Sequence, residues 1–266
     1  MSDNLVTIRV WGDFACFTRP EMKVERVSYP VMTPSAARGI LEAIFWEPEI
    51  YYLIDSIHVI KRGRWFSFRR NEVEKVISMN NLKTWMKAPK KLEPIMAGGG
   101  VGTQRNMLAL QAVEYLITAE VRRSDLCSRH PLKTYLAEIE RRAKNGKCYH
   151  RPYLGVREFA ADFDWEDDAQ RTLERRAAEL GKNWQSIWPE EELGLMLYDV
   201  FNHEQRAEGF RWLPNAQTPS TKKSAPRWQG VLVKPEAIFF HAGIKGAKLD
   251  CHPHRVRLAR NRITGE

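Results

Sequence analysis

The sequence has no long hydrophobic run and few cysteines. No apolar stretch approaches the roughly 20 residues that a membrane-spanning helix needs, so we expect no membrane partner. The first ten residues, MSDNLVTIRV, are polar and then alternating, which does not fit the apolar segment of an export signal. We therefore expect a cytoplasmic protein. Without export, the cysteines predict reduced thiols rather than a disulfide framework; they are Cys16, Cys127, Cys148 and Cys251.

Motifs of several enzyme classes are missing as well. The chain contains neither the Gly-x-Ser-x-Gly elbow of serine hydrolases nor the His-Glu-x-x-His pattern of zinc peptidases. The glycine-rich stretch AGGGVGT at 97–103 lacks the lysine and the following helix of a phosphate-binding loop, so a flexible loop is the better interpretation. The Cys/His pairs at 148–150 and 251–254 are spaced more tightly than structural zinc ligands. We expect neither a metal nor a cofactor.

What is present is an excess of positive charge on a chain that can fold. The 266 residues include 42 Lys or Arg against 33 Asp or Glu, a net charge of +9. Hydrophobic residues make up 43% and aromatic residues 11%, which is enough for a packed core in one main domain with a small annex. A basic balance favours an anionic partner, and nucleic acid is the first candidate.

Hydrophobic periodicity predicts alternating strands and helices in the first part of the chain. A helix is expected within 33–48, with Thr33 as its N-cap, and a second within 131–146. The order strand, helix, strand, inserted segment, strand, helix, strand predicts a ferredoxin-like domain over 1–163, the fold that RNA-recognition motifs share. The expected strands are 5–11, 50–60, 112–122 and 153–163.

The segment 61–91 has a different character. It contains ten Lys or Arg and two Asp or Glu, and aromatic residues interleave with the cations, among them Trp65, Phe66 and Phe68. We interpret it as an inserted basic β-hairpin and loop that protrudes from the domain.

The last hundred residues divide by composition. Residues 164–192 are acidic, with a solvated helix expected at 169–180. Short apolar segments in 193–245 predict a small antiparallel β-rich domain, which a Pro/Ser/Thr/Lys-rich loop interrupts at 214–226. Residues 246–266 form a basic tail. The expected fold class is α+β, a ferredoxin-like domain with an inserted hairpin and a β-rich C-terminal domain.

One stretch, 129–151, concentrates side chains suited to metal-free RNA cleavage. That reaction needs a base for the 2′-hydroxyl proton, an acid for the leaving 5′-oxygen and a cation for the phosphorane. Imidazole titrates near neutral pH and serves as either acid or base, while lysine supplies a compact charge. An ordinary basic helix face, with Tyr135 in its apolar stripe, is the alternative interpretation. The candidates in this stretch are His130, Lys133, Tyr135, Lys147, Tyr149 and His150.

Four blocks of the sequence resemble one protein family. They are VWGDFACFTRPEMKVERVSYPVMTPSAARGILEAIFWEP (10–48), RRNEV (69–73), RRAKNGKCYHRPYLGVREFAADF (141–163) and LGLMLYDV (193–200). Together they resemble the Cas-five subunit of type I-C CRISPR effector complexes, a member of the RAMP superfamily. The resemblance spans residues 5–200 well. It implies a RAMP-type, ferredoxin-like N-terminal domain and a small β-rich C-terminal domain.

The resemblance also implies a function and a set of partners. In that family the subunit cleaves the CRISPR repeat of precursor RNA without metal, leaves a 2′,3′-cyclic phosphate and stays on the 5′ handle of the guide. It would therefore be a pre-crRNA endoribonuclease of antiviral defence. The implied partners are the crRNA and its precursor, the Cascade backbone subunit (Cas-seven), the large subunit (Cas-eight), the small subunit, and target DNA through the complex.

The family's catalytic set is a tyrosine late in the first helix and a Lys-His pair at the start of the second. This chain has Phe45 at the tyrosine position and Lys133-Thr134-Tyr135 around the pair, with a tyrosine where the imidazole usually stands. These changes leave two hypotheses open, a metal-independent nuclease and a non-catalytic scaffold that binds the handle. The implied catalytic candidates are Lys133 as the cation, Tyr135, and the nearest imidazoles, His130 and His150.

The candidates for RNA binding are cations and exposed rings. Each Lys or Arg can neutralise one phosphate. Strict alternation turns Trp65 and Phe66 to opposite sides of the hairpin, so at least one ring is expected to be available for stacking on an unpaired base. The set is Arg19, Lys23, Arg26, Arg38, Trp65, Phe66, Arg69, Arg70, Asn71, Arg105, Lys147, Arg151 and Arg157.

Overall fold

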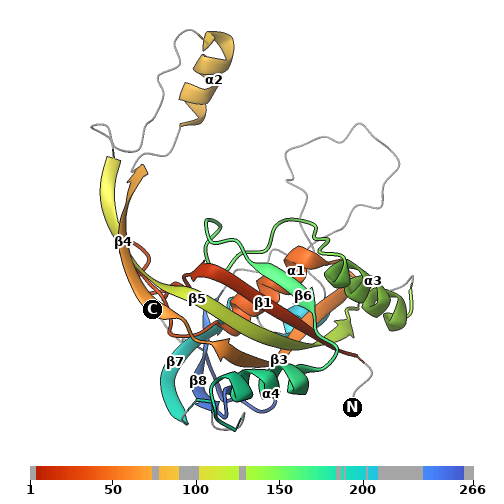
Figure 1. Cartoon of the computed structure of the whole chain (residues 1–266). Helices are drawn as coiled ribbons and strands as arrows, with labels where there is room; N and C mark the ends of the chain where they lie inside the picture. Colours follow the sequence, from red (N-terminus) through yellow and green to blue (C-terminus); the bar gives the residue numbers. More distant parts are fainter. Residues whose placement is uncertain are drawn as a thin grey trace.

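The protein is a mixed α/β structure in which antiparallel sheet predominates (Figure 1). The computed structural model describes residues 4–73, 78–89, 102–125, 130–183, 187–188, 190–201, 203–208 and 236–260. Within these ranges no helix is both long and apolar enough to cross a membrane. The mixed α/β architecture with its mostly antiparallel sheet confirms the coarse fold class expected from the sequence.

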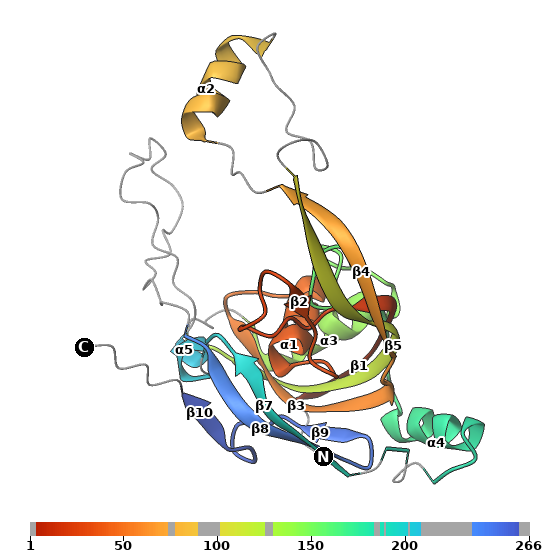
Figure 2. The same ribbon diagram turned by 90° about the vertical axis from the view of Figure 1, so that its left-hand side faces the viewer.

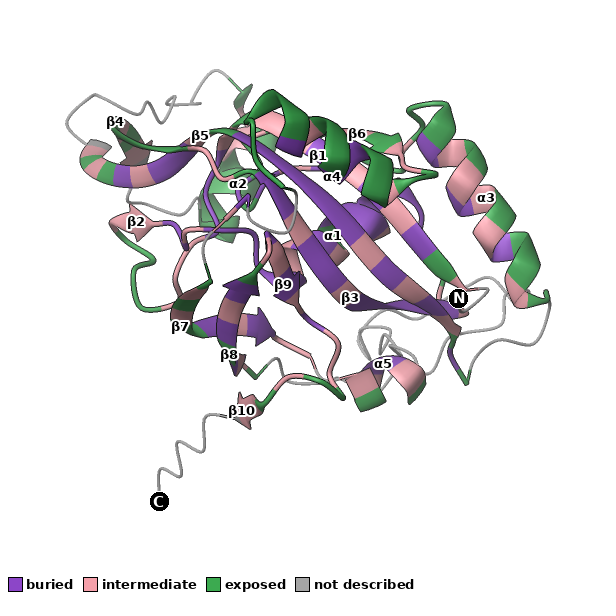
Figure 3. Ribbon diagram, turned by 60° about the horizontal axis from the view of Figure 1, so that its bottom comes forward, coloured by how far each residue is buried: buried purple, intermediate pink, exposed green. Residues whose placement is uncertain are grey.

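Four strands form the centre of the sheet, in the order β3-β5-β1-β6, and each adjacent pair is antiparallel. Every second residue of β5 from Val113 to Val121 is buried, as the alternating pattern predicts. Figure 3 shows the buried positions gathered on these strands and on the helix that packs behind them. The strands are β1 (Leu5–Ala15), β3 (Ile50–Lys61), β5 (Gly102–Arg123) and β6 (Asp162–Trp165).

Helices cover both faces of the sheet. On one face lie α1 (Pro34–Ile44) and α3 (Leu132–Lys144), whose apolar stripes join the main core. On the other lies α4 (Ala169–Glu179), where Leu173 packs against Ile60 and Leu116. The expected start of α1 is confirmed, because the Thr33 hydroxyl accepts a hydrogen bond from the Ala36 N–H at 3.3 Å.

The strand expected at 153–163 is wrong over most of its length. Only β6 forms, and residues 154–159 are turns and bends. Gly155 explains the difference: its φ of +88° is not a strand conformation, and a Cβ there would stand 2.1 Å from the Cys16 carbonyl oxygen. The chain therefore turns against β1 before it enters the sheet.

The basic segment forms one half of a long arm. β4 (Arg64–Val73) pairs with residues 102–111 of β5, so its partner lies outside the range 61–91 given to the hairpin. The arm extends away from the body and carries α2 (Met79–Lys87), a helix that the sequence analysis did not anticipate (Figure 2). A two-residue strand, β2 (Arg26–Val27), runs parallel to β5 at the base of the arm.

The C-terminal strands extend the same sheet. β9 pairs with β3, β8 pairs with β7, β9 and β10, and residues such as Met196 and Phe240 belong to the main core. The described part of the tail contains β9 and β10, while the segments 90–101 and 214–226 lie outside the described residues. These elements are β7 (Glu191–Asp199), α5 (His203–Glu208), β8 (Ile238–Lys245), β9 (Lys248–Asp250) and β10 (Leu258–Arg260).

A largely buried group of four charges ties α1 to the C-terminal strands. Arg38 donates to both carboxylate oxygens of Asp199, at 2.8 and 3.1 Å, and to Glu42 at 2.5 Å. Arg206 of α5 donates to Glu42 at 3.0 Å and to Asp199 at 3.2 Å. Two cations and two carboxylates thus neutralise one another at the joint between α1, β7 and α5.

We expect Asp199→Ala to destabilise the protein strongly. Removing one partner from a buried ion pair leaves uncompensated charge, here on Arg38 and Arg206, and typically costs about 3–5 kcal/mol. Urea denaturation measures the change in the free energy of unfolding. Asp162→Ala is the control, since it removes only the exposed pair with Arg151 and should change stability by less than about 0.5 kcal/mol. Equal effects of the two substitutions would contradict the structural role of the buried group.

Candidate functional site

The start of α3 brings together three of the four catalytic candidates. His130 and Lys133 are exposed, whereas Tyr135 is 4% exposed and packs edge-on against the His130 ring, with centroids 6.1 Å apart. The Tyr135 hydroxyl donates a hydrogen bond to Glu49 Oε2 at 2.5 Å. Tyr135 therefore faces the core with its proton directed at Glu49, which suits a positioning role better than proton transfer.

The first turn of α3 is a helix N-terminus in which the Thr134 N–H donates to the Pro131 carbonyl at 3.0 Å. Its N-cap is Pro131, and among the described residues no side chain caps the turn and no acidic residue lies in it. Unsatisfied N–H groups and the helix dipole make such an end attractive to anions. Lys133 lies exposed in this first turn, where the helix dipole disfavours a cation.

Phe45, the expected counterpart of the family's tyrosine, lies directly after α1. The ring is 6% exposed and is covered by the Arg142 guanidinium, 5.0 Å from its centroid. Its carbonyl oxygen accepts a hydrogen bond from the Tyr52 hydroxyl at 2.6 Å. Phe45 thus packs between the helices and offers no group for proton transfer.

His150, the fourth catalytic candidate, belongs to the opposite end of α3 from Lys133. The helix has 13 residues and is therefore about 20 Å long. The loop after it folds back on α1, where the N–H groups of Tyr149 and His150 both donate to the Ala43 carbonyl, at 2.8 and 3.3 Å. The structure thus groups His130, Lys133 and Tyr135 and places His150 elsewhere, beside α1.

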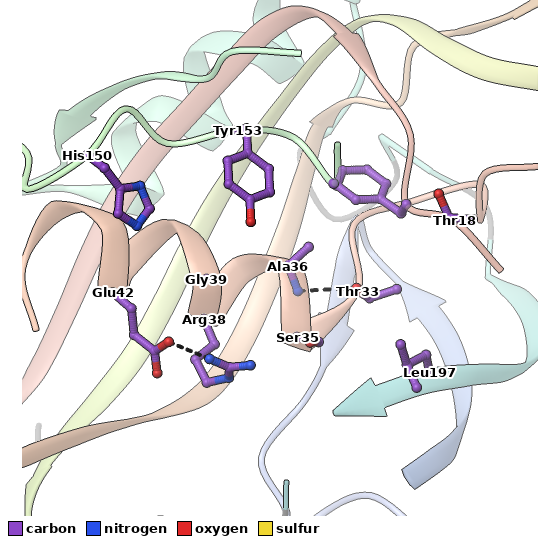
Figure 4. Close-up of a pocket in the computed structure, with 12 residues that line it drawn as sticks. Thr18, Thr33, Ser35, Ala36, Arg38, Gly39, Glu42, His150, Tyr153 and Leu197 are labelled. Atoms are coloured by element: carbon purple, nitrogen blue, oxygen red, sulfur yellow. Dashed lines mark hydrogen bonds and ion pairs between the residues drawn. The ribbon is translucent and has the colours of Figure 1, made fainter. Parts of the chain in front are cut away.

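A cavity of about 390 Å³ opens where this loop faces α1 (Figure 4). The helix forms one wall, and the rings of His150 and Tyr153 stand across from it. Thr18 from the segment after β1 and Leu197 of β7 complete the lining. Of the lining residues, only His150 and Arg38 are site candidates from the sequence, because residue type alone gave Tyr153 and Thr18 no role.

Gly39 lies in the middle of α1 and lines this cavity. It is exposed, and a Cβ built on it would meet no heavy atom within 4 Å. Glycine inside a helix costs about 0.5–1 kcal/mol relative to alanine. No packing constraint in the described structure requires that cost, which distinguishes Gly39 from Gly155.

The charged part of the cavity wall is neutral overall. Arg38 and Glu42 line the cavity and are held in the buried four-charge group. Burial alone would lower the pKa of Arg38, but the carboxylates of Asp199 and Glu42 outweigh burial and raise it. Burial alone would likewise raise the pKa of Asp199, and its two arginine partners hold it below the usual range. Arg38 stays charged, with that charge already matched.

The two faces of the arm differ in what they leave accessible. We call the side of β4 with Phe66, Phe68 and Arg70 the aromatic face. There Phe66 stacks on Phe68 at 5.6 Å and lies 5.4 Å from Phe14, while Arg70 pairs with Glu72 and with Glu158. Arg105 lies opposite Arg70 in the register. On this face the rings pack mainly against one another, and the Arg70 charge is matched by carboxylates of the protein.

The other side of β4 we call the open face; it carries Trp65, Ser67, Arg69 and Asn71. Trp65 is 51% exposed, and Arg69 and Asn71 are exposed too. Within the described ranges Arg69 has no carboxylate close enough for an ion pair. The open face therefore presents a ring and a cation along one strand, and the expectation that one of Trp65 and Phe66 is available is met by Trp65.

The remaining RNA-binding candidates lie in two other places. Near the base of the arm, Arg19 covers the Tyr29 ring at 5.0 Å, Lys23 is exposed, and Arg26 is 3.7 Å from Glu72. The other three candidates follow α3 in the chain, and all three are exposed. One of them, Arg151, forms an ion pair with Asp162 at 3.0 Å. The three are Lys147, Arg151 and Arg157.

The Cys/His pairs at 148–150 and 251–254 do not assemble a metal site in the described structure. No group of three or more His, Cys, Asp or Glu side chains in the described ranges is arranged to hold a metal ion. Cys251 is buried, and its pKa is raised well above the ordinary value by that burial.

Comparison with known proteins identifies the family. A family model described as CRISPR-associated protein (Cas_Cas5), of the Cas5d type, matches residues 5–230. The chain belongs to the Cas5d family. Cas5d is the Cas5 of type I-C CRISPR systems, so the family resemblance seen in the sequence blocks is confirmed.

Two relatives of this Cas5d chain carry the same name, CRISPR pre-crRNA endoribonuclease Cas5d. The one from Mannheimia succiniciproducens is 40% identical over 210 residues, which cover 78% of this chain and 90% of the relative. The one from Thermus thermophilus is 45% identical over 160 residues, covering 60% of this chain and 63% of the relative.

Solved structures share the fold of this Cas5d chain at lower identity. A structure described as a CRISPR-associated protein is 18% identical, with a TM-score of 0.54 and coverage of 92% of this chain and 90% of that one. A functionally uncharacterised protein from Streptococcus mutans, SMU1763c, has the same identity and TM-score, with coverage of 94% and 93%. These two likenesses concern the fold alone.

We expect Gly39→Ala to stabilise the protein. Alanine lowers the conformational entropy of the unfolded chain and favours the helix by about 0.5–1 kcal/mol, and no atom obstructs the new methyl group. Differential scanning calorimetry of the unliganded protein should show a melting temperature higher by about 1–4 °C. A lower melting temperature would mean that the backbone of α1 needs the glycine.

Proposed function

We propose that this Cas5d chain binds the CRISPR repeat in precursor RNA, cleaves it without metal and keeps the 5′ handle of the product. The family and the names of two relatives, both pre-crRNA endoribonucleases, support RNA cleavage. The observation that carries the proposal is the start of α3, where Lys133 occupies an uncapped first turn beside the exposed His130. That arrangement is suited to the scissile phosphate.

The proposed reaction needs three functions. A base removes the 2′-hydroxyl proton, the 2′-oxygen attacks the adjacent phosphorus, and an acid protonates the departing 5′-oxygen. The products are a 2′,3′-cyclic phosphate and a 5′-hydroxyl. We assign the base or acid to the His130 imidazole and the stabilisation of the phosphorane to Lys133, whereas His150, a candidate from the sequence, lies beside α1 and is left out of this assignment. Tyr135, hydrogen-bonded to Glu49, holds the start of α3 in place.

We propose the open face of the arm as the main RNA surface. Trp65 offers a ring for stacking and Arg69 an unmatched charge for a phosphate. Lys147, Arg151 and Arg157 add exposed cations in the segment after α3. In this proposal Arg38 supports the fold of the binding surface, since its charge is matched within the protein.

The proposal extends to the fold description and to the partners. The strand order β3-β5-β1-β6, with α1 and α3 on one face, supports a ferredoxin-like unit. The proposed partners are those of a type I-C complex: the crRNA and its precursor, the backbone subunit (Cas-seven), the large subunit (Cas-eight), the small subunit and, through the complex, target DNA. The domain limits 1–163, 164–192, 193–245 and 246–266 remain predictions.

A second function, a handle-binding scaffold without nuclease activity, is favoured by two observations. Phe45 lacks a hydroxyl and is covered by Arg142. Tyr135, near the position of the family's imidazole, is buried and hydrogen-bonded to Glu49. Neither change touches the arm. A scaffold would bind the repeat tightly and in a salt-dependent manner but would leave it intact.

The deciding experiment incubates the purified protein with its cognate repeat RNA in EDTA and separates the products on a denaturing gel. The nuclease proposal expects one cut and a product that ends in a 2′,3′-cyclic phosphate. A repeat that is bound and uncut would establish the scaffold. A repeat that is neither bound nor cut would contradict both functions.

In the same assay we expect Lys133→Ala to lower the cleavage rate about 10²-fold, the usual effect of losing one transition-state stabiliser. Binding of the repeat should change little, since one charge among many is lost. Lys144→Ala is the matched control, a lysine at the other end of the same helix that pairs with Glu140, and its rate should equal that of the wild type. Wild-type cleavage by Lys133→Ala would contradict the assignment of the cation.

We also expect Arg69→Gln to weaken repeat binding and to reduce the dependence of affinity on salt. Each phosphate contact on a single strand contributes about 0.7 to the slope of log K against log salt, so the slope should fall by about that amount. Arg175→Gln, an exposed position on α4, removes the same charge elsewhere and should leave the slope unchanged. Equal losses in a fluorescence-anisotropy titration would mean that net charge, rather than the arm, drives binding.

A further inference from the structure

The cavity beside α1 lies apart from the start of α3 and from the arm, although two sequence candidates, Arg38 and His150, line it. Its volume of about 390 Å³ lies in the range of pockets that take small organic groups, roughly 300–1,000 Å³. Gly39 opens it further, because a side chain there would project into free space within reach of no other atom. The helix therefore carries a destabilising residue where its backbone lines the cavity.

The charge of the wall argues for an uncharged occupant. The two charged groups that line the cavity, Arg38 and Glu42, are paired with each other and with Asp199 and Arg206. A phosphate would find no unmatched cation in this group. A neutral heterocycle with polar edges would find hydroxyl groups on Thr18 and Ser35 and the carboxylate of Glu42.

The opposite wall argues for a flat occupant. The rings of Tyr153 and His150 face α1 across the cavity (Figure 4), so a planar group can lie between a ring and the bare backbone at Gly39. The same loop exposes two cations, Lys147 and Arg151, of which Arg151 forms an exposed ion pair with Asp162 at 3.0 Å. The cavity lining thus offers rings and hydroxyl groups, and the adjacent loop offers exposed positive charge.

We propose that this cavity binds one unstacked base of the RNA held by the protein, with the flanking phosphates at Lys147 and Arg151. The base stacks on Tyr153 or His150, and its edge is read by Glu42, Thr18 and Ser35. This inference rests on the proposed function, because it takes RNA binding as given and adds a specific subsite.

The test combines Gly39→Leu with a set of repeat RNAs, each lacking the base of one nucleotide. Stacking of one base is worth roughly 5- to 150-fold in affinity, and we expect Gly39→Leu to lose that much with the salt slope unchanged. Removing the base at one position of the repeat should lower the affinity of the wild type by a similar factor. It should not lower the affinity of Gly39→Leu any further. Ala178→Leu, which adds the same side chain to an exposed position of α4, should bind as the wild type does.

The outcomes separate this inference from the function on which it rests. A wild type that does not bind the repeat contradicts the proposed function. If Gly39→Leu binds the repeat as tightly as the wild type does, the base pocket is contradicted and the proposed function is not. The same holds if an abasic nucleotide lowers the affinity of Gly39→Leu by as much as it lowers that of the wild type. Circular dichroism checks that the variant is folded. Should leucine disturb α1, Tyr153→Leu takes its place, with the same non-additive loss expected.

Discussion

The arm and the body of this protein share one strand, and that continuity determines where every candidate site lies. β5 has 22 residues and is about 70 Å long. Along one edge it pairs first with β4 and then with β3, and along the other with β2 and then with β1. The change of partner coincides with positive φ values at Gly63 and Ala112. Because the same ladder anchors both parts, the arm extends from the sheet at a fixed register.

Internal charge pairing sorts the basic residues of this chain into two groups. Arg38 and Arg206 form ion pairs with Glu42 and Asp199 within the core. Arg70 forms ion pairs with Glu72 and Glu158 on the aromatic face. These pairs support the fold and contribute little attraction to an anion. Arg69, Lys133 and Lys147 are exposed without such pairing in the described residues.

The sequence predicted the periodic parts of the fold and missed what depends on distant contacts. The strands at 5–11, 50–60 and 112–122 and the two helices are confirmed, because alternation and capping are local properties. The strand at 153–163 is not, because the conformation of Gly155 follows from the Cys16 backbone 139 positions earlier. The cavity escaped notice for the same reason: its walls come from α1, the loop after α3, and β7. The sequence shows which residues are cations. Which of these cations stay accessible depends on their ion pairs, and those can be read only from the folded structure.

The surfaces proposed to bind RNA and the residues proposed for catalysis occupy different elements in this chain. The open face belongs to β4, and the cavity lies between α1 and the loop after α3, whereas Phe45 follows α1 and the catalytic candidates Lys133 and Tyr135 lie at the start of α3. Phe45 and Tyr135 are both buried in the main core, so their identity is constrained by packing as well as by catalysis. A change at either position can therefore be absorbed by the core without disturbing the surfaces proposed to hold RNA. Without a proton donor at the end of α1, the protein would still bind its guide RNA. With an imidazole kept near Lys133, it would also still cleave the precursor to produce that guide.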